Sequence, residues 1–236
     1  MWLFNSSIGR KLVMSITGLF LILFLTFHMC MNLVALFSAE SYNMICEFLG
    51  ANWYALAGTL VLAGGVIFHI IYAFILYFQN KKARGNDAYA VTAKPKEVEW
   101  ASQNMLVLGI VVVAFLLLHL YNFWAKMQLV EILHKLGIHV DSFALANAAD
   151  GAYHIAATFS DPILVVLYLV GLGALWFHLT HGFWSAFQTI GITNKIWFNR
   201  WKWIGNIFAT VVIFGFAIVV IIFFIKSICC GGACGI

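Results

Sequence analysis

The sequence predicts an all-α integral membrane protein that forms one domain over residues 1–236 and crosses the membrane five times. Hydrophobic residues make up 64% of the chain and charged residues only 9%, whereas soluble domains contain about 25% charged residues. Five apolar runs are each far longer than the ~10 residues of a membrane β-strand, so a β-barrel is excluded. The length of these runs leaves no room for a separate soluble catalytic domain.

The five runs follow one another with polar segments between them. The first run, 12–37, is too long for the apolar core of a signal peptide and lacks a clear cleavage site. The fourth begins at Pro162, whose missing N–H is harmless in a first helical turn. Residues 125–159 are too polar to cross the membrane, so we expect short amphipathic helices along its surface. The expected spans are 12–37, 53–78, 102–124, 162–187 and 204–225.

Lys and Arg residues are distributed unequally between the two sides of this layout, which predicts its orientation. Cytoplasmic loops of membrane proteins carry the excess of these residues, so the N-terminus is expected in the cytoplasm and the C-terminus opposite. The localisation that follows is the cell inner membrane, and the net charge of +4 indicates no nucleic-acid partner. The N-terminal side holds Arg10, Lys11, Lys81, Lys82, Arg84, Lys94, Lys96, Lys195, Arg200 and Lys202, against Lys126, Lys135 and Lys226 on the other.

Four spans carry histidines deep in the apolar sequence, where an imidazole is costly unless its nitrogens are used. His28 and His119 stand 16 and 17 residues into helices that enter from the cytoplasmic side, about 25 Å deep, and so near the outer face. His69 and His178 stand 16 residues into helices that enter from the outer side, and so in the cytoplasmic half. We interpret these two layers as bis-imidazole ligand sets for two b haems around which four helices bundle. Taken singly, each histidine is more often a helix–helix hydrogen-bond donor or a pore residue.

His181 lies three residues after His178, and the two cannot both face one iron. His178 shares its helix face with Gly171, Ala174 and Gly182, which leaves a bare surface for a flat macrocycle. The face of His181 is crowded by aromatic side chains, so we expect it to make a propionate or interface hydrogen bond. The remaining histidines, which we expect on the solvated surface, are His134, His139 and His154.

Two segments resemble a known family. Ser-Ser-Ile-Gly-Arg-Lys-Leu-Val-Met-Ser-Ile-Thr-Gly at 6–18, and Phe-His-Leu-Thr-His-Gly-Phe-Trp-Ser-Ala-Phe-Gln-Thr-Ile-Gly at 177–191, are similar to the dihaem cytochrome b anchor of succinate:quinone oxidoreductases of the b558 type. The resemblance covers essentially the whole chain. It implies an anchor that holds a flavoprotein and an iron–sulfur subunit at the cytoplasmic face and conducts electrons to or from a membrane quinone, expected to be menaquinone. The chain has no Gly-x-Gly-x-x-Gly motif and no spaced cysteine set, so the dicarboxylate chemistry is expected in the partners.

Further candidates follow from the chemistry of quinone and haem. Reduction of a quinone consumes two protons, and Glu47, then Glu40, in the first outer loop are candidate relays, although a solvated loop acid is an equal alternative. Anionic propionates of the inner haem need donors or cations near the cytoplasmic interface. The resemblance favours a hydroxyl about a dozen residues before the first ligand, which is Ser15. The full set of propionate candidates is Ser15, Arg10, Lys11 and Lys195.

Two other functions remain open. The chain could serve another quinone-linked dehydrogenase, of the formate dehydrogenase or hydrogenase type, although those often place two ligands on one helix. A small transporter with histidines on a substrate path would need broken helices and polar mid-depth faces, which these spans lack. Cys229, Cys230 and Cys234 crowd a Gly-rich tail and fit a metal site, a disulfide or an acylated terminus.

Overall fold

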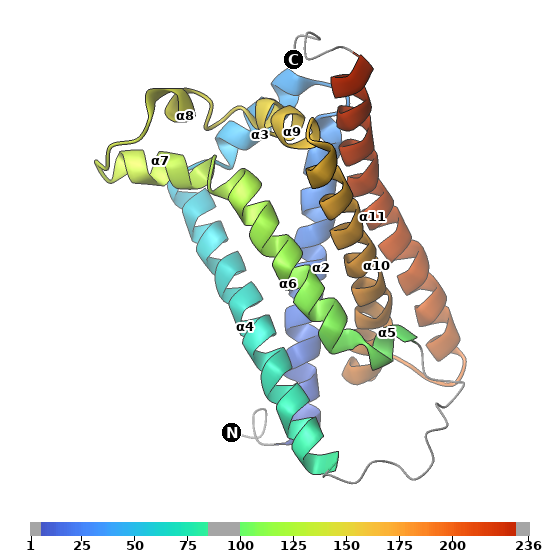
Figure 1. Cartoon of the computed structure of the whole chain (residues 1–236). Coiled ribbons are helices and arrows are strands. Elements are labelled where there is room, and N and C mark those ends of the chain that lie inside the picture. The colour runs from blue at the N-terminus through green and yellow to red at the C-terminus, as the bar shows by residue number, and fades with distance from the viewer. Residues whose placement is uncertain (1–5, 85–99, 230–236) are drawn as a thin grey trace.

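The computed structural model describes residues 6–84 and 100–229, and over these ranges the protein is helical without strands. Five helices are long and apolar enough to span a membrane, which confirms the predicted fold class. They run side by side in Figure 1, and most of the short helices lie at the end where the C-terminus lies, whereas α5 (Trp100–Gln103) lies toward the other end. The long elements are α2 (Ser7–Val34), α4 (Trp53–Arg84), α6 (Met105–His119) with one turn of π-helix, η1 (Leu120–Trp124), α10 (Pro162–Ile190) and α11 (Trp197–Cys229).

Several helices continue beyond the expected apolar runs. α4 extends to Arg84 instead of ending near residue 78, so Lys81 and Lys82 stand on a helix. α11 begins at Trp197, seven residues before the expected 204, because the Asn194 side chain accepts hydrogen bonds from the backbone N–H groups of Ile196 and Trp197, both at 2.9 Å. Apolarity sets where the chain enters hydrocarbon, whereas capping and propensity set where a helix ends. Of the residues singled out above, Lys94, Lys96, Cys230 and Cys234 lie outside the described ranges.

α10 is the central element of the bundle. Its N-terminus is capped by Asp161, whose side chain accepts from the N–H of Ile163 at 2.8 Å, and its C-terminus ends at Gly191 in the left-handed conformation, φ 89°. Within the described residues, α10 packs against α11, α2 and α6. A Cβ on Gly205 would lie 3.0 Å from the Phe183 ring, so the glycine allows α11 to approach α10 closely.

The segment expected along the membrane surface forms α7 (Gln128–Lys135), α8 (Ser142–Ala146) and α9 (Gly151–Phe159). Together with α3 (Ala39–Phe48), these helices lie over the C-terminal end of the bundle (Figure 1). α7 is anchored to the turn before α4, because a Glu131 carboxylate oxygen accepts from the N–H of Ala51 at 2.6 Å. Lys135 donates to the carbonyl oxygen of the same residue.

α9 differs from a surface helix, and the expectation of a solvated His154 is wrong. It packs against α11, α3 and α10 and buries Ala152 and Ile155 completely or nearly so. His154 is 7% exposed, and its Nε2 donates to the carbonyl oxygen of Asn147 at 3.1 Å. Burial lowers the pKa of His154 from its usual value of 6.5. His134 and His139 are exposed, as expected.

Candidate functional site

His28 on α2 and His119 at the end of α6 meet inside the bundle. Their ring centroids are 5.7 Å apart and their planes are nearly perpendicular, at 85°. This spacing allows one metal ion to be bound by both imidazoles. Phe24 stacks on His28 at 5.4 Å, and Tyr168 lies 6.3 Å from His119, so aromatic rings surround the pair. The structure thus brings together the two histidines that the sequence assigns to the outer layer.

A turn of π-helix follows His119 directly. Such turns are rare in proteins, and those that occur often lie at functional sites. The extra residue in the turn rotates the neighbouring side chains about the helix axis. Within this turn Asn122 is 3% exposed and donates to the hydroxyl of Tyr168 at 3.3 Å. The amide and the phenol thereby place a polar pair beside the outer histidines.

His69 on α4 is held by α2. Thr17 Oγ1 lies 3.0 Å from His69 Nδ1 and also 2.9 Å from the carbonyl oxygen of Met14. A hydroxyl has one proton, and the Met14 carbonyl can only accept, so the Thr17 oxygen accepts from an Nδ1–H of His69. The Nε2 of His69 then carries the lone pair that a metal ligand requires.

His178 stands on α10, and its imidazole faces α6. Its Cε1 is 4.0 Å from the position that a Cβ on Gly109 would take, and the Cε1 of His69 is 3.7 Å from that position on Gly18. Each inner imidazole therefore faces a glycine of another helix. Within residues 6–84 and 100–229, the buried Nδ1 of His178 has no hydrogen-bond partner, an orphaned polar atom of the kind that a missing ligand or water explains.

The helices that carry three of these four histidines bury fewer of their residues than the other two spans. In the most apolar 18-residue stretch of each helix, the share of buried residues is 6% in α2 and in α4 and 11% in α6, against 33% in α10 and 39% in α11. Among the described helices, α4 packs closely against α2 but not against α6 or α10. α4 therefore has no close helix packing against α10, the helix that carries His178.

His181 faces a different environment from His178. Its ring contacts Trp184 at 5.1 Å, and the Lys202 ammonium of α11 lies 4.9 Å from the Trp184 ring centre. These residues lie toward the Lys/Arg-rich end of the bundle, beyond the His178 position. Lys202 was not a candidate from the sequence, because its approach to α10 depends on the early start of α11.

The remaining propionate candidates occupy the same end of α2 and the α10–α11 turn. The Arg10 guanidinium donates to Gln79 Oε1 at 2.6 Å and so ties α2 to α4. Ser15 is 8% exposed, and its hydroxyl donates to the carbonyl oxygen of Lys11 at 3.0 Å. Lys11 and Lys195 are exposed. Ser15 is therefore the member of the set that lies inside the bundle.

An apolar groove of about 410 Å³ lies between α2 and α3. Phe27, the neighbour of His28 in the chain, forms part of its wall, and Ser41 contributes a hydroxyl. Glu40 and Glu47 are exposed on α3, and not in a loop as expected from the sequence. They stand seven residues apart, so both lie on one flank of α3 beside the groove. The complete lining is Phe27, Met31, Ser41, Met44, Ile45, Phe48 and Leu49.

A curated relative supports the family that the sequence motifs suggest. The chain is 24% identical over 172 residues to the succinate dehydrogenase cytochrome b558 subunit of Bacillus subtilis (strain 168). The similarity covers 72% of this chain and 73% of that protein. No family model and no solved structure matches the chain.

Sequence reasoning missed the residues that orient the candidate ligands. The Asn32 amide nitrogen lies 3.4 Å from His28 Nδ1 and donates to the His28 carbonyl oxygen at 2.8 Å. Tyr42 of α3 donates to the Asn32 side-chain oxygen at 3.1 Å, so α3 is linked through Asn32 to His28. The available signal was an asparagine four residues after a histidine in an apolar run, on the same helix face. For His69 no such signal existed, because Thr17 is on another helix.

Proposed function

We propose that this protein is the membrane anchor and electron-transfer subunit of a succinate:quinone oxidoreductase. The observation that carries the proposal is the close approach of His28 and His119 across two helices, at 5.7 Å between ring centroids. Two further helices, α4 and α10, carry the other two candidate ligands, His69 and His178, which we assign to the second layer. The distant similarity to a succinate dehydrogenase cytochrome b558 subunit supports the same assignment.

The residues fit two b haems. His28 and His119 would bind the iron of the outer haem, and His69 and His178 that of the inner haem. Haem b, when bound, supplies one-electron transfer along the membrane normal. Thr17 of α2 fixes the ring of His69 and leaves its Nε2 unprotonated. Ser15, also on α2, is buried near the level expected for the propionates.

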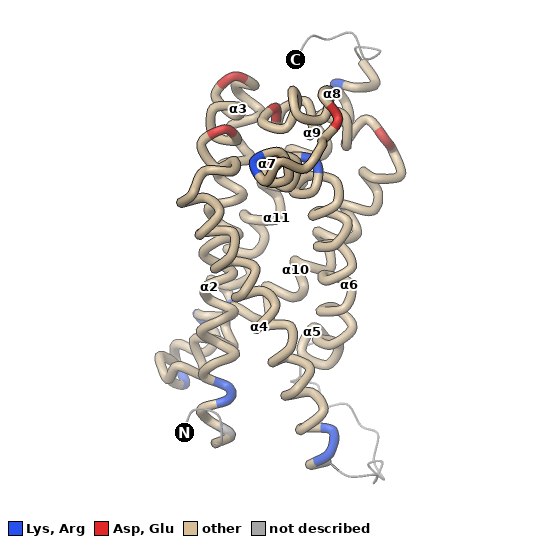
Figure 2. The backbone as a smooth tube through the Cα atoms, turned by 90° about the vertical axis from the view of Figure 1, so that its left-hand side faces the viewer, with Lys and Arg blue, Asp and Glu red and all other residues tan. Residues whose placement is uncertain are grey.

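The Lys/Arg-rich end of the bundle is the proposed docking face for the flavoprotein and iron–sulfur subunits. Figure 2 shows Lys and Arg without Asp or Glu at the N-terminal end, and Asp and Glu together with a few Lys or Arg at the other. By the positive-inside rule this end is cytoplasmic in the inner membrane. Surface charge of this kind steers the encounter of partners more than it fixes their affinity. The described cations there are Arg10, Lys11, Lys81, Lys82, Arg84, Lys195, Arg200 and Lys202.

The quinone is proposed to bind in the groove between α2 and α3, next to the outer histidines. The apolar lining suits an isoprenoid quinone such as menaquinone, and Ser41 can donate to a quinone oxygen. Glu47, or Glu40 in second place, would deliver protons from the outer surface to the groove. Glu47→Gln is expected to slow quinone turnover several-fold while haem content is unchanged, whereas full turnover in both Glu47→Gln and Glu40→Gln excludes the two residues as relays.

The assignment as a whole is tested with the complex purified from membranes in mild detergent. We expect two haems b per chain in a reduced-minus-oxidised spectrum, co-purification of a flavoprotein and an iron–sulfur protein, and succinate-dependent reduction of a menaquinone analogue. A b-type spectrum with formate or hydrogen as the electron donor would instead favour another dehydrogenase. The absence of a b-type α-band would refute both cytochrome assignments.

A further inference from the structure

A buried tyrosine hydroxyl on α4 has a proton that no described residue accepts. Tyr72 is 8% exposed, and within residues 6–84 and 100–229 its hydroxyl has no hydrogen-bond partner. An unpaired hydroxyl away from water is costly, so native proteins nearly always supply an acceptor for it. This orphaned donor therefore indicates an acceptor that is bound between the helices.

Tyr72 stands on the same face of α4 as His69. It follows His69 by three residues, and positions three apart are neighbours on a helix surface. This is the face that α4 turns toward α2, because His69 contacts Thr17 of that helix, whereas Ile71 and Phe74 are exposed. α4 runs toward the Lys/Arg-rich end of the bundle, so Tyr72 lies about 4.5 Å nearer that end than His69.

Two hydrogen bonds between α2 and α4 give the level of Tyr72 along α2. Thr17 lies 3.0 Å from His69, and Arg10 donates to Gln79 at 2.6 Å, so the two helices run in opposite directions. Tyr72 lies between His69 and Gln79 on α4. It is therefore opposite the segment of α2 between Thr17 and Arg10.

The hydroxyls of this α2 segment already donate their protons. Ser15 is 8% exposed and donates to the carbonyl oxygen of Lys11 at 3.0 Å, and Thr17 donates to that of Met14 at 2.9 Å. Because a hydroxyl has one proton, both oxygens are left as acceptors. Among these three described hydroxyls, Tyr72 is the one with a proton to give to an anion.

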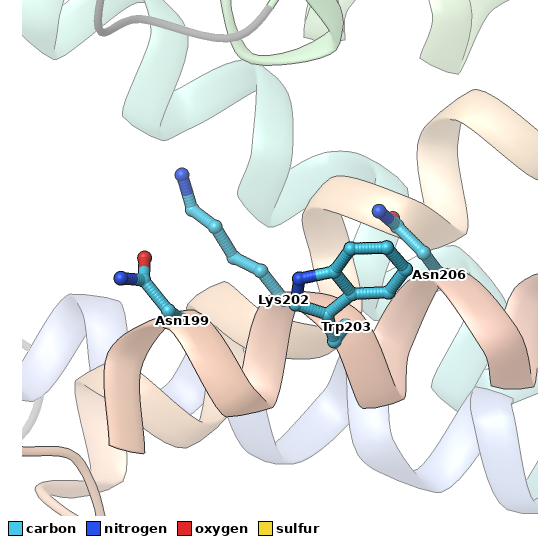
Figure 3. Close-up of a pocket in the computed structure, with 4 residues that line it drawn as sticks. All are labelled: Asn199, Lys202, Trp203 and Asn206. Atoms are coloured by element: carbon cyan, nitrogen blue, oxygen red, sulfur yellow. The ribbon is translucent and has the colours of Figure 1, made fainter. Parts of the chain in front are cut away.

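The Tyr72 hydroxyl is also separate from the pockets on the outside of the bundle. Tyr72 does not line the groove beside His28, nor does it line a pocket of about 310 Å³ on the flank of α11 (Figure 3). The hydroxyl is thus enclosed among the helices, where bulk water does not compete for its proton and a hydrogen bond is strong. The pocket on α11 is lined by Asn199, Lys202, Trp203 and Asn206.

We propose that Tyr72 donates a hydrogen bond to a propionate of the inner haem, an inference that rests on the proposed function. The propionates are the anionic groups of a haem, and a carboxylate forms its strongest hydrogen bonds with donors that have no other acceptor. Tyr72 stands beside the proposed ligand His69, on the side where an anion is nearer the cytoplasmic surface. It takes the part that the sequence suggested for Ser15.

Redox titration of the complex in isolated membranes tests the proposal. The titration step that is lost in His178→Ala identifies the inner haem. Tyr72→Phe removes only the hydroxyl, so both haems should remain, and the midpoint potential of the inner haem should fall while that of the outer haem is unchanged. With one donor fewer, more negative charge stays on the propionate, which disfavours the electron added on reduction.

Two control variants and one spectrum distinguish this contact from a general effect on α4. Tyr77→Phe removes a hydroxyl five residues further along α4, on another face, and should leave both potentials unchanged. Ser15→Ala should shift the inner potential less than Tyr72→Phe, because the Ser15 proton is donated to Lys11. With isotope-labelled tyrosine, an infrared difference spectrum should show a tyrosine C–O band that shifts when the inner haem is reduced and that is missing in Tyr72→Phe.

Failure of this inference can be told apart from failure of the proposed function. A b-type spectrum with unchanged potentials in Tyr72→Phe, as expected if the hydroxyl binds a water molecule instead, would overturn the role of Tyr72 and leave the haem assignment standing. Equal shifts of both haems in Tyr72→Phe, or an equal shift in Tyr77→Phe, would do the same. Absence of a b-type α-band in the wild type would overturn both.

Discussion

At the scale of single residues, the ring nitrogens of the four candidate ligand histidines are not held alike. Thr17 fixes Nδ1 of His69 from another helix, and Asn32 approaches Nδ1 of His28 from one turn further along the same helix. A partner that accepts from Nδ1–H leaves Nε2 with the lone pair that a ligand needs, as Thr17 does for His69, whereas the Asn32 amide nitrogen is itself a donor and contributes only to the orientation of the His28 ring. His178 lacks such a partner within the described residues, so its orientation depends on packing against α6 near Gly109.

The first prediction separates His178 from His181. His178→Ala should remove the inner haem and so about half of the b-type absorbance, because an axial imidazole is lost. His181→Ala should retain both haems, since the His181 ring packs against Trp184, on a different face of α10 from His178. Reduced-minus-oxidised spectra with a haem stoichiometry measure both. The reverse pattern, with the haem lost only in His181→Ala, would require His181 to be the ligand.

The second prediction uses two glycines of α10 with equal local space. A Cβ at Gly182 or at Gly173 would meet nothing within 4 Å in the described residues. Gly182 shares the face of His178, whereas Gly173 is exposed. Gly182→Leu should therefore reduce incorporation of the inner haem, because a leucine occupies space that a macrocycle needs, and Gly173→Leu should have full haem content. Equal haem content in the two variants would contradict a macrocycle at Gly182.

At the scale of elements, the long helices and the short ones differ in how far the sequence predicts them. The long spans follow from hydrophobic length alone, because an apolar segment in hydrocarbon must satisfy its own backbone hydrogen bonds. The position of α9 depends on tertiary contacts: Gly151 packs against Cys46 and Tyr42 of α3, and Asn43 accepts from the N–H of Ala152 at 2.9 Å. The polarity of residues 125–159 does not indicate these tertiary contacts, so the burial of His154 could not be predicted from the sequence.

The same distinction applies to the candidate site. The pairing of His28 with His119 followed from counting depth along two helices that enter from the same side. The hydrogen bond of His69 to Thr17 and the approach of Lys202 to Trp184 depend on the rotation of neighbouring helices about their axes. Depth is readable from a hydrophobic sequence of known orientation, whereas rotation is set by packing between helices.

The third prediction concerns the pH dependence of α9. Burial lowers the pKa of His154, so the folded protein binds this proton more weakly than the unfolded chain. Stability from the neutral imidazole is therefore fully present above about pH 6.5, the unfolded value, and decreases as the pH falls below it. Thermal unfolding followed at pH 5 and pH 7.5 should show a smaller difference in His154→Gln than in the wild type. His139→Gln, at an exposed position, should behave like the wild type.

At the scale of the whole molecule, charge is separated along the bundle axis. The described cations concentrate at the end where α2 and α11 begin and α4 ends, and the described acids lie at the end covered by α3, α7, α8 and α9 (Figure 2). Such an arrangement presents surfaces of different charge at the two ends of the bundle. Under the proposed function, the basic end would receive the hydrophilic subunits, and the acidic end would exchange protons beside the α2–α3 groove.

The fourth prediction tests the basic end as the docking face for the hydrophilic subunits. Lys81, Lys82 and Arg84 stand together on the last turn of α4, which extends past the apolar span. Reversing all three to Glu should weaken assembly about tenfold or more at low ionic strength, since each exposed pair contributes up to about 1 kcal/mol. The defect should become smaller as salt screens the charges over the Debye length.

Lys126→Glu and Lys226→Glu, at the opposite end, are the controls and should assemble normally. Co-purification of the iron–sulfur subunit at 20 mM and 500 mM salt measures this difference, and equal recovery for the triple variant and the wild type at both concentrations would exclude this turn of α4 from the docking face.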